Sequence, residues 1–302
     1  MIRKTERRRR YGDRSDGWLL RGQYPLERII PYFMKRRSAS SNMFSDSINI
    51  GEIEKYIRKK RGEGFPGFGI MHVLVAAYVR LIAEFPALNR FVSGQRVYAR
   101  NNIEVMLNIK EEMTLDSPET VIKSEFDVLA TSADVYTSLN TQINDYRQNP
   151  DNNVDGISSV FNRIPGLFLK FAVFFLKFLD YFGILPKALL KLSPFHGTVY
   201  LTSMGSLGIP PVFHHLYDFG NVPVFISFGT KMRKYEPDST GNVKEIRYVQ
   251  VCINSDERIC DGYYFAAAFK RLKRILRDPS FLDSVPETVK IDPSLDKKKR
   301  VK

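Results

Sequence analysis

The stretch from Ile164 to Lys191 is the most apolar part of the chain, and its interpretation decides between a membrane-spanning protein and a globular one. A helix that spans a bilayer needs about 20 predominantly apolar residues. Lys170, Lys177 and Asp180 interrupt this stretch, and a glycine and a proline follow soon after. The sequence therefore predicts helices here that do not cross a membrane.

The rest of the chain alternates between helical and strand patterns without a regular strand–helix–strand repeat. Apolar residues three and four positions apart predict helices, whereas short apolar runs between Gly, Asn or Pro predict strands. This mixture predicts an α+β fold, in which helices flank a mixed β-sheet. Predicted helices cover 25–37, 70–85, 133–147 and 263–276, and predicted strands cover 43–50, 96–99, 103–109, 121–126, 198–203, 224–229 and 245–254.

The positive charge is concentrated at the two ends of the chain. The net charge is +13, from 46 Lys and Arg against 33 Asp and Glu. Residues 1–14 contribute +5 and residues 297–302 contribute another +5, so the body carries +3. Neither end shows hydrophobic periodicity, which predicts a basic flexible arm over 1–20 and a basic tail over 286–302. Such arms are candidates for weak contact with an anionic membrane surface or with nucleic acid.

Cysteine and histidine usage excludes several familiar kinds of site. The two cysteines, Cys252 and Cys260, favour a reducing compartment, so we expect a cytoplasmic protein, or one at the membrane periphery, without disulfides. No zinc-binding, phosphate-loop or serine-hydrolase motif is present, and we expect no metal site. Of the four histidines, His72 lies in an apolar helix and is predicted to pack, whereas the adjacent His214 and His215 are candidates for a site.

Three segments resemble one known family in order and spacing. Residues 256–262 resemble the Asp-His-Arg-x-x-Asp-Gly signature of dihydrolipoyl acyltransferase catalytic domains and of chloramphenicol acetyltransferase. Residues 197–208 resemble the family's Gly-Thr-Phe-Thr-x-Ser-Asn-x-Gly-x-x-Gly strand and loop, and residues 76–89 resemble its helix ending in Pro-x-Leu-Asn. The resemblance covers residues 25–282 and implies a chloramphenicol acetyltransferase-like fold.

The resemblance also implies an activity and a set of site residues. Its members are acyl-CoA-dependent transferases, usually trimeric, with active sites between subunits, so coenzyme A and a homotrimer are expected. The signature aspartate, which holds the family's site together through an ion pair, corresponds to Asp261. The oxyanion-binding hydroxyl corresponds to Thr202, with Ser203 beside it. Ser203 and Gly205 are the expected coenzyme A-binding positions.

The catalytic histidine of the signature is replaced by Glu257. An unperturbed carboxylate is a weaker base than imidazole by about 2 pKa units, although burial in an apolar channel raises a carboxylate's pKa. The base is therefore either Glu257 or a histidine, His215 or His214, and a catalytically inactive binding or scaffolding protein is the alternative. Cys260 is expected to be an inert thiol instead of a nucleophile.

The resemblance divides the chain into three regions. An acyltransferase-like catalytic domain is expected over 21–285, with an apolar helical insertion at 161–191. No lipoyl group is expected in cis, because the first 20 residues have no lipoyl-domain pattern, so a stand-alone transferase is expected. The insertion suggests a hydrophobic acceptor, a long acyl group or a membrane surface, and the expected acceptor is a small molecule or lipid-like. Its helices could lie against the sheet or a partner chain, at a membrane interface, in a subunit contact, or over an acyl chain as a lid.

Overall fold

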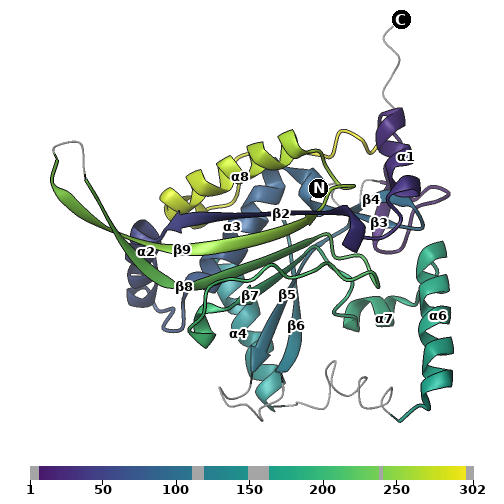
Figure 1. Cartoon of the computed structure of the whole chain (residues 1–302), viewed down its shortest axis with the longest axis horizontal. Coiled ribbons are helices and arrows are strands. Elements are labelled where there is room, and N and C mark those ends of the chain that lie inside the picture. Colours follow the sequence, from purple (N-terminus) through teal and green to yellow (C-terminus); the bar gives the residue numbers. More distant parts are fainter. Residues whose placement is uncertain (1–6, 111–118, 149–162, 238–240, 297–302) are drawn as a thin grey trace, which may run out of the picture.

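The computed structural model describes residues 7–110, 119–148, 163–237 and 241–296. Within these residues, six strands form a mixed sheet in the order β2-β9-β8-β7-β5-β6 (Figure 1). β7 runs parallel to β5 and β8, and the other neighbours are antiparallel. The strands are β2 (Ser41–Asn49), β5 (Ile103–Lys110), β6 (Glu119–Phe126), β7 (Val199–Ser203), β8 (Val224–Pro237) and β9 (Val243–Asp256).

Four helices pack together on one face of this sheet. α3 lies at their centre, in contact with α2, α4 and α8. Its residues are apolar on nearly every side, so a helix of this kind is stable only when it is buried all round. Alternate residues of the strands, such as Leu201, Ile226 and Ile253, join this core. The four helices are α2 (Gly51–Gly62), α3 (Ile70–Glu84), α4 (Ser132–Gln148) and α8 (Gly262–Arg277).

A three-stranded sheet and further short elements complete the molecule. The small sheet has the order β1-β4-β3. Its strands are β1 (Gly17–Leu19), β3 (Arg90–Ser93) and β4 (Arg96–Arg100), and the short 3₁₀ turns are Ser38–Ser40, Pro86–Asn89, Gly205–Leu207 and Pro279–Leu282. α1 (Pro25–Phe33) lies beside the small sheet (Figure 1). The α+β fold with a mixed sheet is confirmed.

The apolar stretch folds into two helices, α6 (Gly166–Phe182) and α7 (Lys187–Leu192). Residues 161 and 162 of the predicted insertion lie outside the described residues. Among the described residues, no helix is long and apolar enough to cross a membrane. Figure 1 shows α6 at the edge of the molecule, away from the large sheet.

The amino-terminal segment differs from the flexible arm that the charge pattern predicts. β1 pairs with β4, and the Arg9 guanidinium lies 4.4 Å from the centre of the Trp18 ring. Arg14 is only 4% exposed and donates hydrogen bonds to carboxylate oxygens of Asp16 and Asp180, at 2.8 and 2.7 Å. Arg14 therefore belongs to the folded body, because its charge has a buried partner, Asp180, far along the chain.

The boundary predicted at residue 285 is also too early. Asp292 is buried and accepts two hydrogen bonds from Arg90, at 2.6 and 2.8 Å. Arg7 donates to Asp296 at 2.8 Å, so the two ends of the described chain meet. The folded body extends to residue 296, whereas residues 1–6 and 297–302 lie outside the described residues.

Removing the Arg14 side chain leaves Asp180 buried without its guanidinium partner. Breaking a buried ion pair in this way costs about 3–5 kcal/mol. We expect Arg14→Ala to lower the free energy of unfolding in urea by that amount. The exposed pair of Arg10 and Asp296 provides the control, because Arg10→Ala removes a surface pair worth less than about 1 kcal/mol. Equal, small decreases in the free energy of unfolding for both variants would show that the amino-terminal segment is not packed against the body.

Candidate active site

The signature segment joins the end of β9 to the start of α8, and its first aspartate is fully buried. Asp256 is 1% exposed. Arg258 clamps both of its carboxylate oxygens, with Nε–Oδ1 and Nη2–Oδ2 distances of 2.8 and 2.7 Å. The Nε atom of Arg37 lies 3.5 Å from Oδ2. This bidentate geometry fixes the turn between β9 and α8, because a planar guanidinium constrains the carboxylate in both position and orientation.

The two arginines connect this turn to distant parts of the chain. Arg258 Nη1 donates to the backbone oxygen of Met34, just after α1, at 2.9 Å. Arg37 donates to the backbone oxygens of Tyr217 and Gly220, at 2.6 and 2.9 Å. Burial lowers the pKa of Arg37, and the Asp256 carboxylate opposes that effect. Asp256 therefore lies at the junction of α1, the β7–β8 loop and the signature turn.

Glu257 follows the buried aspartate and lies at the surface. Its backbone N–H donates to the backbone oxygen of Ser40 at 2.9 Å, and its side chain is exposed. The burial in an apolar channel that would favour a glutamate base is therefore absent within one protomer.

The last aspartate of the signature has a different role from the one that the resemblance implies. Asp261 is exposed and is the amino-terminal cap of α8, where Oδ1 accepts a hydrogen bond from the Tyr264 N–H at 2.7 Å. The ion pair expected for Asp261 is instead made by Asp256, five positions earlier. The reason is local: an N-cap side chain folds back on its own helix, toward donors that the first turn leaves unpaired.

The expected oxyanion-binding residues lie far from Glu257 in the same chain. Thr202 of β7 is opposite Ser227 of β8, which is opposite Cys252 of β9. Cys252 precedes Glu257 by five residues, which corresponds to about 16 Å along a strand. One protomer therefore does not bring Thr202 and Glu257 together.

The hydroxyl groups at the end of β7 differ in accessibility. Thr202 is 4% exposed, whereas Ser203 is half-buried and its Oγ accepts a hydrogen bond from the Ser206 N–H at 3.4 Å. Gly205 is required sterically, since a Cβ there would lie 2.6 Å from the backbone oxygen of Gly229. Close packing of this turn on β8 thus explains the glycine without a ligand.

The two adjacent histidines lie on the loop between β7 and β8. The backbone oxygen of His214 accepts a hydrogen bond from Asn254 Nδ2 at 2.8 Å, so this loop is attached near the end of β9. The His214 ring stacks on Phe225, with ring centres 4.3 Å apart. His215 is exposed, with its ring edge-on to Tyr217. Of the two, His215 has the accessible imidazole.

Cys260 has the properties of an inert thiol. Burial raises its pKa to about 12, and nearby Arg90 only partly offsets this effect. A thiol is nucleophilic as the thiolate, which this environment disfavours. Both cysteines of the chain are free.

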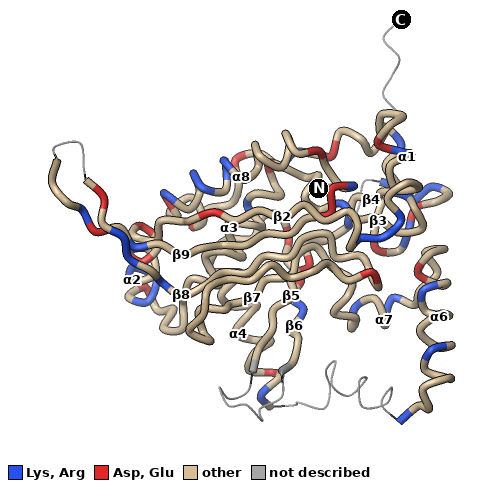
Figure 2. Tube along the Cα trace, viewed as in Figure 1, with Lys and Arg blue, Asp and Glu red and all other residues tan. Residues whose placement is uncertain are grey.

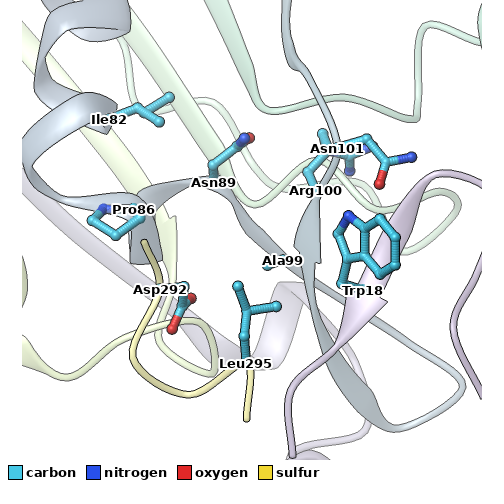
Figure 3. Close-up of a pocket in the computed structure, with 9 residues that line it drawn as sticks. All are labelled: Trp18, Ile82, Pro86, Asn89, Ala99, Arg100, Asn101, Asp292 and Leu295. Atoms are coloured by element: carbon cyan, nitrogen blue, oxygen red, sulfur yellow. The ribbon is translucent and has the colours of Figure 1, made fainter. Parts of the chain in front are cut away.

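Two pockets flank the signature turn. A groove of about 530 Å³ lies between β2 and α8, and Asp261, Phe265 and Phe269 contribute to its wall. On the other side, a pocket of about 210 Å³ is lined by Arg37 and Arg258. A third cavity, beside Trp18 and Asp292, measures only about 40 Å³ and is too small for a substrate (Figure 3). Among the described residues, no group of three or more potential metal ligands occurs.

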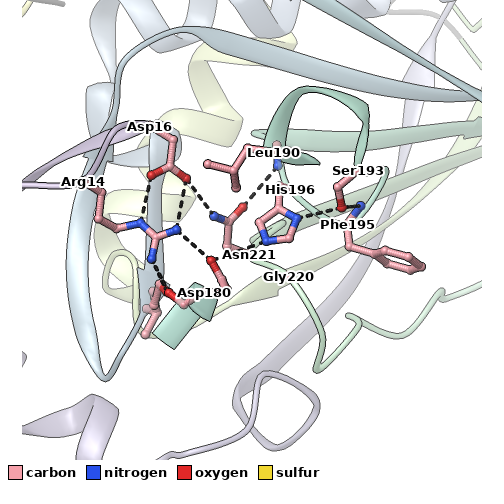
Figure 4. Close-up of polar contacts among 12 residues, drawn as sticks. Arg14, Asp16, Asp180, Leu190, Ser193, Phe195, His196, Gly220 and Asn221 are labelled. Carbon is pink, nitrogen blue, oxygen red and sulfur yellow. Dashed lines mark hydrogen bonds and ion pairs between the residues drawn. The ribbon is translucent and has the colours of Figure 1, made fainter. Parts of the chain in front are cut away.

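A buried polar cluster was not predicted from the sequence (Figure 4). Asp180 pairs with Arg14, and its Oδ1 lies 3.5 Å from Nε2 of His196. The other ring nitrogen of His196, Nδ1, lies 2.7 Å from Oγ of Ser193. His196 is 1% exposed and burial lowers its pKa, so this cluster is structural. The lone acidic residue within an apolar helix was the signal that could have revealed it.

Comparisons with known proteins identify the fold. No protein-family model matches the chain, and no curated protein sequence matches it. A probable dihydrolipoamide acetyltransferase from Listeria monocytogenes is 14% identical, with a TM-score of 0.51 over 84% of this chain and 94% of that one. The dihydrolipoamide acetyltransferase of Azotobacter vinelandii is 13% identical, with a TM-score of 0.52 over 86% and 93% of the two chains. The chain has the fold of an acyltransferase catalytic core.

A third solved structure shows the same similarity. The truncated catalytic core of the 2-oxoacid dehydrogenase complex from Thermoplasma acidophilum is 13% identical, with a TM-score of 0.52 over 85% of this chain and 97% of that one. The predicted acyltransferase-like fold is therefore confirmed over most of the chain. At this identity the comparison establishes the fold, and activity has to be argued from the residues.

The burial of His72 predicts that the free energy of unfolding decreases at acidic pH. It is buried in α3, as expected, and burial lowers its pKa to about 4. Because the unfolded-state pKa is about 6.5, the folded protein binds the proton less well, and stability is lost as pH falls from 6.5 toward 4. His72→Gln removes this titration and retains an acceptor for the Gly69 N–H.

Between about pH 7 and about pH 4.5, we expect the free energy of unfolding of this variant to fall by about 2 kcal/mol less than that of the wild type, as measured by urea unfolding. His196, also buried, titrates in both proteins and is therefore the internal control. Identical pH profiles would show that His72 is not buried as a neutral ring.

Proposed function

We propose that this protein is an acyl-CoA-dependent acyltransferase that transfers an acyl group to a thiol or hydroxyl acceptor. The observation that carries the proposal is the signature turn: on an acyltransferase-core fold, residues 256–262 occupy a strand–helix junction fixed by the buried Asp256–Arg258 pair. Both cysteines are free thiols, which supports a reducing compartment such as the cytoplasm.

The arrangement of the two clusters supports a homotrimer with composite sites. Glu257 and the hydroxyls of Thr202 and Ser203 are separated by about 16 Å along the sheet of one protomer. In the proposed cyclic trimer, Glu257 of one copy would face the β7 end of the next; a head-to-tail contact joins two different surfaces, as this arrangement requires. The site is then incomplete without a second copy.

The proposed reaction uses these groups in one transfer. Glu257 removes the proton from the acceptor S–H or O–H, and the resulting nucleophile attacks the thioester carbonyl carbon. The hydroxyl of Thr202 or Ser203 donates a hydrogen bond to the tetrahedral oxyanion. Collapse of this intermediate breaks the C–S bond, and the coenzyme A thiolate takes up the proton from Glu257.

The groove between β2 and α8 fits the chemistry of an acyl-CoA. Phe44, Phe265 and Phe269 make its wall apolar, which suits a pantetheine arm or acyl chain. Lys270 is exposed beside it, while Lys273 is paired with Asp46 at 2.7 Å. An exposed ammonium group next to an apolar groove suits a ligand that carries both phosphates and an acyl chain.

Two alternatives concern the base. His215 is exposed on the loop attached near the end of β9, so it can replace Glu257 as the base if the acceptor enters from that side. The exposed carboxylate at the histidine position also favours a second function, a catalytically inactive binding or scaffolding protein. The shape of the completed site determines whether the acceptor is a small molecule or lipid-like.

Coenzyme A binding tests the substrate class. A ligand that binds only the native state stabilises it, so about 1 mM coenzyme A or acetyl-CoA is expected to raise the Tm by about 3 °C or more. Lys270→Glu is expected to reduce this shift, whereas Lys244→Glu, an exposed lysine of the β8–β9 hairpin, leaves it unchanged. No shift with any acyl-CoA, and no release of free thiol, would refute the proposal.

The base is identified by matched substitutions in a thiol-release assay. Removing a general base costs about 100-fold or more in kcat. We expect Glu257→Gln to show this loss and His215→Gln to retain activity; the opposite pattern assigns the base to His215. Light scattering of both variants checks that the trimer persists. If the protein binds coenzyme A but shows no turnover, and Glu257→His does not create activity, the result supports the scaffolding function.

A further inference from the structure

In helix α6 the apolar residues are exposed and the acidic residue is buried, which the proposed reaction does not explain. Within the described part of the chain, Asp180 is the one residue of α6 that is buried. Its phenylalanines point outward and are 48–68% exposed: Phe168, Phe171, Phe174, Phe175 and Phe178. A contiguous apolar surface of this kind on a folded domain marks a site of interaction.

The outward orientation of α6 is fixed by contacts at its carboxyl-terminal end. Asp180 pairs with Arg14, and the Tyr181 hydroxyl donates to Gln95 Oε1 at 3.0 Å. The backbone of Tyr181 also approaches Gly94 so closely that a Cβ there would lie 2.3 Å from its oxygen. These contacts hold the carboxyl-terminal end of α6 on the body, and the phenylalanines along the helix remain exposed.

The exposed charged residues within residues 163–192 are all positive. Arg163, Lys170 and Lys177 precede or lie within α6, and Lys187 and Lys191 lie in α7; all five are exposed. Figure 2 shows these basic positions along α6 and α7. The one acidic residue of this region, Asp180, is occupied by Arg14. The exposed surface of residues 163–192 therefore combines aromatic rings with positive charge; Asp218 shares a pocket with Lys177, and Glu125 shares one with Lys187 and Lys191.

This combination fits the surface of an anionic bilayer. Helices that lie in the membrane interface bury aromatic and aliphatic rings about 5–10 Å deep and place lysines at the headgroups. Lys170 and Lys177 are seven residues apart, so they lie on one side of α6, at the edge of the aromatic surface. From that edge their long side chains reach the phosphates while the rings insert.

A second copy of the chain fits this surface less well. Contact of the α6 surface with itself would place Lys170 and Lys177 against the same lysines, and residues 163–192 offer no exposed carboxylate to pair with them. Like charges brought together in this way are destabilising. A bilayer that contains anionic lipid supplies both the apolar depth and the negative charge.

We propose that α6 docks this protein on the surface of an anionic lipid bilayer, with its phenylalanines inserted and Lys170 and Lys177 at the lipid phosphates. The carboxyl-terminal end of the helix remains attached to the body through Asp180. This docking does not depend on acyl transfer, because neither the inserted phenylalanines nor the two lysines take part in the proposed reaction.

Flotation of the full-length protein with vesicles tests the proposal without any acyl-CoA. We expect binding to phosphatidylcholine vesicles with about 30% phosphatidylglycerol, weak binding to phosphatidylcholine alone, and loss of binding as salt is raised. Lys170→Glu with Lys177→Glu is expected to reduce binding at least about 10-fold. The matched control, Arg58→Glu with Lys244→Glu, changes two exposed cationic residues outside α6, α7 and the proposed site, and it is expected to bind like the wild type.

A second variant tests the apolar part of the contact. Phe171→Ser, Phe175→Ser and Phe178→Ser together should abolish flotation and leave the Tm unchanged, because these rings are 48–68% exposed and belong to neither hydrophobic core cluster. Equal binding of all variants, or no binding by the wild type, overturns the proposal. A wild type that does not bind vesicles, together with a serine variant that changes mass in light scattering, assigns the surface to another copy of the chain instead.

Discussion

The ion pair between Arg14 and Asp180 holds together parts of the chain that the sequence separates by 166 positions. Arg14 also donates to Asp16 and to the Ser93 hydroxyl, and Asp180 lies beside His196. The pair thus joins the amino-terminal segment, the β3–β4 turn, the end of α6 and the entrance to β7. His196 and Arg14 together outweigh the effect of burial and lower the pKa of Asp180 to about 2, so the carboxylate is charged at neutral pH. A buried charge of this kind allows little freedom in placement, because any displacement leaves it unpaired.

The Asp256 network applies the same constraint to the proposed site. A buried carboxylate is clamped by Arg258 and lies near Arg37, and the arginines in turn bind backbone oxygens near α1 and in the β7–β8 loop. This arrangement fixes the backbone on both sides of Glu257 while leaving its side chain exposed. A rigid turn with an exposed functional group suits a site that a second protomer completes, since the group is positioned before the partner arrives.

Local patterns predicted most of the elements, whereas long-range pairing of charges did not follow from them. The helix around Val73 and the strand ending at Ser203 show clear periodicity, and both are present in the structure. Arg14 was assigned to a solvated arm because its own neighbours are polar, yet its partner lies in α6. The resemblance likewise implies an ion pair at Asp261, whereas Asp256 makes the ion pair with Arg258. A sequence motif gives the spacing of residues but does not give the direction in which each side chain points. The distance between Thr202 and Glu257 required the strand register, which the sequence does not specify.

Helix α6 and the signature turn both line the pocket of about 210 Å³. Its wall includes Lys177 and Tyr181 of α6 as well as Arg258 of the turn, so the docking helix and the acyl-transfer site share one border. If α6 lies on a bilayer, this pocket opens close to the lipid headgroups. An acceptor held in the membrane would then approach the turn without leaving the interface, and its apolar part would stay in lipid. The cost of desolvating a long chain would be avoided, which gives a physical reason for a lipid-like acceptor and for the position of the apolar helices beside the site.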